Sequence, residues 1–167
     1  GATHSAKKYA LEALRSIVAM QDVQSGGNRH ARYLEAAFDA VRESEDFSGR
    51  FGSVDQNSLK RMVAVHETEA LKDRDLQNVS AWEATESYLA VARSKFVQAV
   101  SGVREGGDAL VMLGIIQRRI SPRGDTHAAS VAVTLQRAAV EVSPNNSLAY
   151  QELGSTLLHQ GLVEQAV

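Results

Sequence analysis

Apolar residues recur along this chain at steps of three and four, with polar residues between them. This spacing places apolar side chains along one face of an α-helix. It predicts about seven to eight helices, starting with residues 4–24, 29–46, 57–75 and 80–104 and continuing with 109–120, 126–142, 147–160 and a pattern that begins after residue 161. We therefore expect an all-α fold.

The connections between the helices have signatures of their own. A glycine-containing turn at 25–28 should join two antiparallel helices. Ser80 and Glu83 have the spacing of a capping box. Gly106–Gly107 is predicted to be a turn, and Asp108 is expected to cap the helix that follows it. Later signals are Asp125 or Thr126 as a helix start and Pro144 as a helix break. Asn145, Asn146 and Ser147 are expected to be turn and capping residues, and Gly161 a helix stop.

The longest predicted loop of the first half covers residues 47–57 and is rich in glycine. We expect Phe47 and Phe51 to anchor it to the core. Arg50 lies between two glycines, so a phosphate-binding cradle is the alternative. However, no strand precedes this loop and no lysine–serine pair leads from it into a helix. The anchoring role is therefore preferred.

The last part of the chain carries the most specific pattern. Tetratricopeptide repeats are helix–turn–helix units of about 34 residues with sparse apolar and small signature positions. With Ser147 as the first position of a unit, residues 147–166 resemble this family. The matching residues are Tyr150, Leu153, Gly154, Leu157, Gly161 and Ala166, with Pro144 closing the previous unit. Gly154 stands inside a predicted helix, where glycine costs about 1 kcal/mol relative to alanine, so we expect a neighbouring helix to approach it closely.

Residues 107–146 form a longer unit of the same kind. Leu110, Leu113 and Gly114 repeat the offsets of the last unit, although Gln136 stands where the family usually has a large apolar residue. The resemblance implies antiparallel hairpins stacked as a right-handed superhelix, an α-solenoid. It divides the chain into divergent repeat-like hairpins at 1–106 and repeats at 107–167, the last of them truncated.

Composition supports helices and narrows the class of protein. Of the 167 residues, 44% are hydrophobic but only 5% are aromatic, a balance that favours packed helices over sheets. A net charge of −2 gives no general attraction to nucleic acid or anionic membranes. The absence of cysteine excludes disulfides, thiol nucleophiles and cysteine-ligated zinc.

Two features bear on location. No apolar run approaches the roughly 20 residues that span a bilayer. Because the chain begins with Gly1 and ends in mid-pattern, we expect a soluble fragment of a longer protein. Its location is either cytoplasmic or exported, with a signal or anchor removed.

Candidate chemistry is sparse. His66–Glu67 resembles the start of a zinc-protease motif, but Ala70 stands where the second histidine is needed. We interpret these residues, and the carboxylates of Glu83 and Glu86, as polar helix surface in water. No catalytic residue, metal site or cofactor is predicted, so an enzyme is not expected. A helical-bundle metalloenzyme remains the minor alternative.

The resemblance implies a function in protein binding, with a peptide or a partner helix held in the concave groove. In the family, groove residues lie on the first helix of each repeat. The corresponding residues here are Val111, Ile115, Arg118, Arg119, Gln151, Ser155, Leu158 and His159. A basic cluster of Arg118, Arg119 and Arg123 either grips a carboxylate or phosphate or is solvated at a helix C-terminus. The alternative function is a self-assembly scaffold that associates through Leu157, Leu162 and Val167 of the last repeat.

Overall fold

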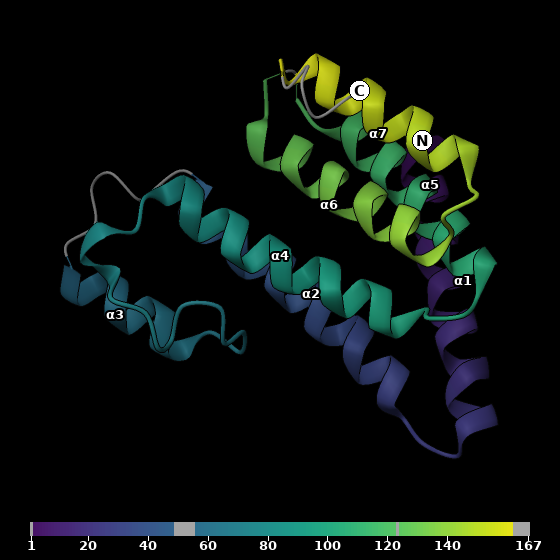
Figure 1. Cartoon of the computed structure of the whole chain (residues 1–167), viewed down its shortest axis with the longest axis horizontal. Helices are drawn as coiled ribbons and strands as arrows, with labels where there is room; N and C mark the ends of the chain where they lie inside the picture. Colours follow the sequence, from purple (N-terminus) through teal and green to yellow (C-terminus); the bar gives the residue numbers. More distant parts are fainter. Residues whose placement is uncertain (1, 49–55, 123, 162–167) are drawn as a thin grey trace.

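The computed structural model describes the backbone of residues 2–48, 56–122 and 124–161 (Figure 1). This part of the chain contains no strand, so the predicted all-α class is confirmed. It contains seven α-helices and one 3₁₀ turn: α1 (Ala2–Ser25), α2 (Arg29–Ser48), α3 (Gln56–Val65), η2 (Leu76–Asn78), α4 (Ala81–Ala99), α5 (Arg104–Ile120), α6 (Thr126–Val142) and α7 (Ser147–His159).

The helices pair in an order that the sequence did not predict. Instead of packing along each other as a hairpin, α1 and α2 diverge from their turn in a V (Figure 1). Helix α1 packs mainly against α5, and α2 packs mainly against α4, to which it runs antiparallel. Helices α5 and α6 do form an antiparallel hairpin, which α4 and α7 cover by packing against α6. The expected pairing of the first two helices is therefore wrong.

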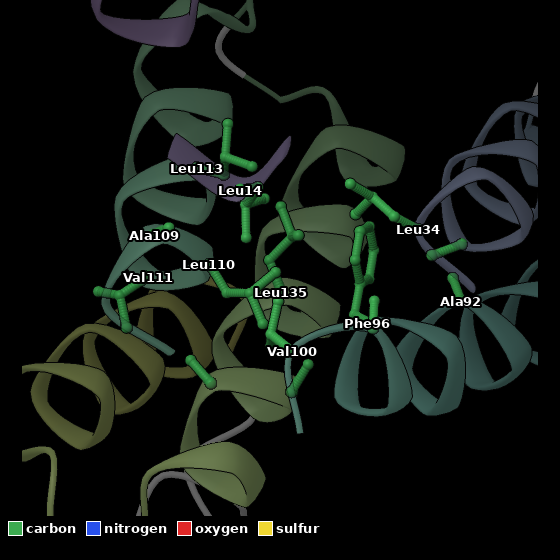
Figure 2. Close-up of a cluster of buried hydrophobic side chains, with 14 of the residues drawn as sticks. Leu14, Leu34, Ala92, Phe96, Val100, Ala109, Leu110, Val111, Leu113 and Leu135 are labelled. Carbon is green, nitrogen blue, oxygen red and sulfur yellow. The ribbon is translucent and has the colours of Figure 1, made fainter. Parts of the chain in front are cut away.

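One core joins six of these helices. Its buried side chains include Leu14 of α1, Leu34 of α2, Phe96 of α4, Leu110 of α5, Leu135 of α6 and Ala149 of α7. Figure 2 shows side chains from α1, α2, α4, α5 and α6 converging in this cluster. The rings of Phe38 and Phe96 meet edge to face with centroids 5.2 Å apart. Burying one large apolar side chain contributes about 1.5–3 kcal/mol, so this cluster is the main source of stability.

A second, smaller core lies at the far end of the α2–α4 pair. It contains Phe47, Leu59, Leu71 and Tyr88 and holds α3 with the segment that follows it. The predicted helix over 57–75 is wrong in length, because α3 ends at Val65 and turns follow it. Phe47 is buried as expected but belongs to α2, whereas Arg50 and Phe51 lie outside the described residues.

The turn predicted at the start of α5 is not found there. Gly106 and Gly107 are buried inside the helix and form no turn. A Cβ on Gly106 would lie 2.5 Å from Cβ of Val100, and one on Gly107 would lie 2.5 Å from Oγ of Ser143. Both glycines therefore allow close packing. The turn instead uses Gly102, whose φ of 78° suits glycine, so α4 ends at Ala99 and not near residue 104.

Three of the predicted helix caps are confirmed, but Asp108 lies within α5, whose N-cap is Val103. Ser80 and Glu83 form the capping box, with hydrogen bonds of 3.1 Å and 2.8 Å between side chain and backbone. Asp125 caps α6 by accepting from the amide of Ala128 at 2.9 Å. Asn146 caps the start of α7. This helix ends at His159, shortly before Gly161, whose φ is 74°. These signals are local, so they do not depend on how the helices pack.

The predicted apolar stripe of α7 is only partly buried. Leu157 is buried, but Leu148, Tyr150 and Leu158 are 43%, 51% and 55% exposed. The helix instead turns the small Ala149 toward its neighbours. Val163 and Ala166 lie outside the described residues. No helix in the described part of the chain combines the length and the hydrophobicity that crossing a bilayer requires.

Candidate functional site

A cleft of about 810 Å³ lies between the diverging helices α1 and α2. Each of these two helices supplies one wall, and side chains of α4, α5 and α6 form the floor. Most of the lining is apolar and includes Leu11, Val18, Leu34, Phe38, Leu113 and Val131. Leu11 and Phe38 are only half-buried, so the cleft presents apolar surface to the solvent.

Hydrogen bonds at the apex of the V hold the two walls in place. The carboxylate of Asp22, near the end of α1, accepts from the amides of His30 and Ala31 at 2.8 Å each and so caps α2. Burial by itself would raise the pKa of Asp22. The two amide hydrogen bonds and the nearby charges of His30 and Arg29 outweigh burial and lower this pKa below its ordinary value.

The apex is also tied to the connection between α4 and α5. The ring nitrogen Nδ1 of His30 pairs with the carbonyl of Ala99 at 3.1 Å. Nε2 of Gln21 donates to the carbonyl of Ser101 at 2.8 Å. Because α1 also packs on α5 and α2 on α4, each wall rests on a different support. The cleft is therefore part of the folded structure before any ligand binds.

The two rims of the cleft carry opposite charges. Lys7 and Arg15 line the α1 wall, and Glu35, Asp39 and Glu45 line the α2 wall. Asp39 forms an ion pair of 2.6 Å with Arg42 one turn later. Ion pairs within the described residues involve none of the other four, Lys7, Arg15, Glu35 and Glu45. Their charges therefore remain available at the rims of the cleft.

A neutral histidine lies at the wide end of the cleft. The hydroxyl of Ser44 donates to the carbonyl of Val41 at 2.6 Å, so its oxygen accepts from Nε2 of His127 at 2.8 Å. Burial lowers the pKa of His127, although Glu45 and Asp125 oppose this effect. This end of the cleft therefore offers a dipole instead of a positive charge at neutral pH.

The structure corrects the interpretation of His66. It lies just after α3, is buried, and does not belong to a solvated helix face. Its Nδ1 pairs with the hydroxyl of Tyr88 at 2.7 Å, and its Nε2 pairs with Oδ2 of Asp46 at 3.2 Å. Burial, together with the carboxylates of Glu43 and Asp46, raises the pKa of Tyr88, which stays protonated.

Glu43 completes this polar cluster. Its carboxylate accepts from the backbone amides of Glu67 at 2.6 Å and Thr68 at 3.1 Å. The cluster thus fixes the chain after α3 to α2 and α4. These groups find their hydrogen-bond partners within the cluster and the adjoining backbone, as expected for a structural role. In the described part of the chain, no group of three or more metal-binding side chains could hold a metal ion.

The groove residues implied by the repeat resemblance lie on α5 and α7, away from the cleft. Val111 and Ile115 are buried, whereas Arg119, Gln151, Leu158 and His159 are exposed and Ser155 is half-buried. Arg118 links the two helices: it donates to Glu152 and Thr156 at 3.1 Å each and to Ser155 at 3.3 Å. For the self-assembly hypothesis, Leu157 is buried, and Leu162 and Val167 lie outside the described residues.

The sequence does not predict the cleft, because the residues that line it have the same apolar spacing as core residues. Leu11 and Phe38 occupy the apolar faces of their helices, and only the divergence of α1 and α2 leaves them partly uncovered. Comparison with protein-family models, curated proteins and solved structures finds no match to this chain.

Proposed function

We propose that this chain is a non-enzymatic protein-binding module that receives an amphipathic helix of a partner in the cleft between α1 and α2. The observation that carries the proposal is the apolar, preformed cleft with one helix on each side. A helix laid between two diverging helices completes a three-helix arrangement and buries its apolar stripe on the floor.

The length of the cleft suits a helix. The lining runs from Lys7 to Ala19 along α1 and from Ala31 to Glu45 along α2. At 1.5 Å per residue these walls are about 18 and 21 Å long, which suits a partner helix of about 12–14 residues.

The tetratricopeptide-like stack is a compatible proposal for the wider protein. The run α5–α6–α7 supports it, because α7 packs against both helices of the preceding hairpin. The close approach at Gly114, where a Cβ would lie 3.1 Å from the carbonyl oxygen of Ala132, also suits such packing. A stack of this kind places the proposed groove on α5 and α7. That face is the alternative location for a partner.

The proposal is tested with a fluorescent 18-residue amphipathic helical peptide whose apolar residues recur at i, i+3, i+4 and i+7. Fluorescence anisotropy measures its affinity for the protein and two matched variants. Leu11→Glu puts a charge in the half-buried cleft lining, and Leu158→Glu puts the same charge on the exposed α7 face. A charge that the bound helix desolvates costs binding free energy, so we expect Leu11→Glu to weaken binding at least tenfold.

Leu158→Glu should leave the affinity within twofold of the wild-type value. The opposite ranking of the two variants would assign binding to the α5–α7 face. Absence of measurable binding to the wild-type protein would contradict the proposed function. Circular dichroism of both variants checks that each retains its helical content.

A further inference from the structure

We infer that the opposite charges of the two cleft walls select a partner helix with segregated flanks and fix the direction in which it lies. This inference rests on the proposed function. The partner helix would carry acidic residues on the flank facing α1 and basic residues on the flank facing α2, with an apolar stripe between them.

The first support is the distribution of unpaired charge. Lys7 and Arg15 stand eight residues apart on α1, a rise of about 12 Å. Glu35 and Glu45 stand ten residues apart on α2, a rise of about 15 Å. Arg15, Glu35 and Glu45 are exposed and Lys7 is half-buried, and none of the four has an ionic partner in the described part of the chain. Each wall therefore presents two charges of one sign.

The second support is that the remaining charged groups of the cleft are already engaged. Asp39 pairs with Arg42 on the same wall. The carboxylate of Asp125 caps α6. His127 pairs with Ser44, and a lowered pKa keeps it neutral. The field across the cleft thus runs from a basic α1 rim to an acidic α2 rim, with an apolar floor between them.

The direction of the bound helix follows from its symmetry. When a helix keeps its apolar stripe on the floor but reverses its axis, its left and right flanks exchange places. A sequence with one acidic and one basic flank therefore satisfies both walls in only one direction. The same sequence in the reverse direction would place like charges against each other on both sides.

Three peptides of identical composition test this inference. The first has acidic and basic residues segregated on the two flanks, the second has the flanks exchanged, and the third has both signs mixed on each flank. Exposed ion pairs each contribute about 0.2–1 kcal/mol. We expect the first two peptides to bind about tenfold more tightly than the third at low ionic strength, with the difference shrinking in high salt.

Direction is read by fluorescence quenching. The protein has no cysteine, so a single introduced cysteine carries a nitroxide without further changes. Tyr9→Cys and Met20→Cys place it at exposed positions near opposite ends of the α1 wall and outside the lining of the cleft. A fluorophore on the peptide N-terminus should be quenched from one position for the first peptide and from the other position for the second.

A charge-swapped protein is the matched control. Lys7→Glu and Arg15→Glu combined with Glu35→Lys and Glu45→Lys leave the net charge unchanged. This variant should keep the preference for segregated flanks and reverse both quenching patterns. Equal affinity for all three peptides, or one shared direction for the first two, would overturn the inference while leaving the cleft as the binding site. Absence of binding by any peptide to the wild-type protein would overturn the proposed function as well.

Discussion

The side chain of Gln136 packs directly against Gly114. It occupies the space that a side chain at position 114 would need. A Cβ on Gly114 would lie 3.1 Å from Cγ of Gln136. Gln136 is fully buried, and neither its amide nitrogen nor its carbonyl oxygen has a hydrogen-bond partner in the described part of the chain. A polar group in this state lowers stability.

Gln136→Met should therefore stabilise the protein. Methionine keeps nearly the same length and removes two buried polar atoms, each of which costs about 1–3 kcal/mol when unsatisfied. We expect the free energy of unfolding to rise by about 1–3 kcal/mol in urea titrations. Gln98→Met is the control. Because Gln98 is half-buried and donates a hydrogen bond to Ser94, its replacement should change the free energy of unfolding by no more than about 0.5 kcal/mol. A less stable Gln136→Met protein would contradict this account.

Gly106→Ala should destabilise the protein although alanine is the better helix former. The added Cβ would lie 2.5 Å from Cβ of Val100, an atom that moves only with its backbone. The clash should exceed the gain of about 1 kcal/mol in helix propensity, for a net loss of about 1–2 kcal/mol. Gly27→Ala has no atom within 4 Å of its new Cβ and should be neutral or slightly stabilising. Equal stability of the two variants in urea would argue against the close packing of α5.

These residues also show what the sequence can predict. The capping signals of Ser80, Asp125 and Asn146 were correct because a cap involves atoms within one turn of the chain. Gly106 and Gly107 were predicted to form a turn, but α5 begins at Arg104 and includes both, and the turn falls at Gly102 instead. Local pattern therefore predicted the starts of α4, α6 and α7 but placed the start of α5 too late.

The candidate site depends still more on packing. Leu11 and Phe38 fit the apolar faces of α1 and α2, as core residues would. They line a cleft because α1 packs on α5 while α2 packs on α4, and neither pairing follows from spacing along the chain. His66 illustrates the same limit, since its partners Asp46 and Tyr88 lie about twenty residues away on either side.

Asp22→Asn should weaken the dependence of stability on acidic pH. In the folded state the pKa of Asp22 lies below its ordinary value of 3.8, so the ionised form of Asp22 stabilises the fold. This contribution is complete above the ordinary pKa near 4 and is lost as the pH falls through the lower folded value. Melting temperatures measured between pH 2 and 6 should fall less steeply for Asp22→Asn than for the wild-type protein.

The control for this pH profile is Asp73→Asn, which alters an exposed carboxylate outside the V. The melting temperature of Asp73→Asn should fall with decreasing pH in the same way as that of the wild-type protein. If Asp22→Asn and the wild-type protein lost stability in parallel as the pH fell, the cap at the apex of the V would not contribute as described.

Glu43→Gln should loosen the segment after α3 while the main core stays intact. A neutral amide offers one acceptor in place of the two carboxylate oxygens that bind the amides of Glu67 and Thr68. We expect faster hydrogen exchange at these two amides, with a local loss of about 1–3 kcal/mol. The amides of α6 serve as the internal control and should exchange at the wild-type rate. Uniform acceleration of exchange across both regions would show instead that the hydrogen bonds of Glu43 support the whole fold.

The most direct test of the proposed helix-binding cleft is a titration of the ¹⁵N-labelled protein with the amphipathic 18-residue peptide, followed by amide chemical shifts. The proposal predicts that the largest changes fall on Leu11, Ala19, Ala31 and Phe38, with little change at Tyr150 and Leu158. Changes concentrated on α5 and α7, or spread evenly over the surface, would contradict the assignment of the binding site to the cleft between α1 and α2.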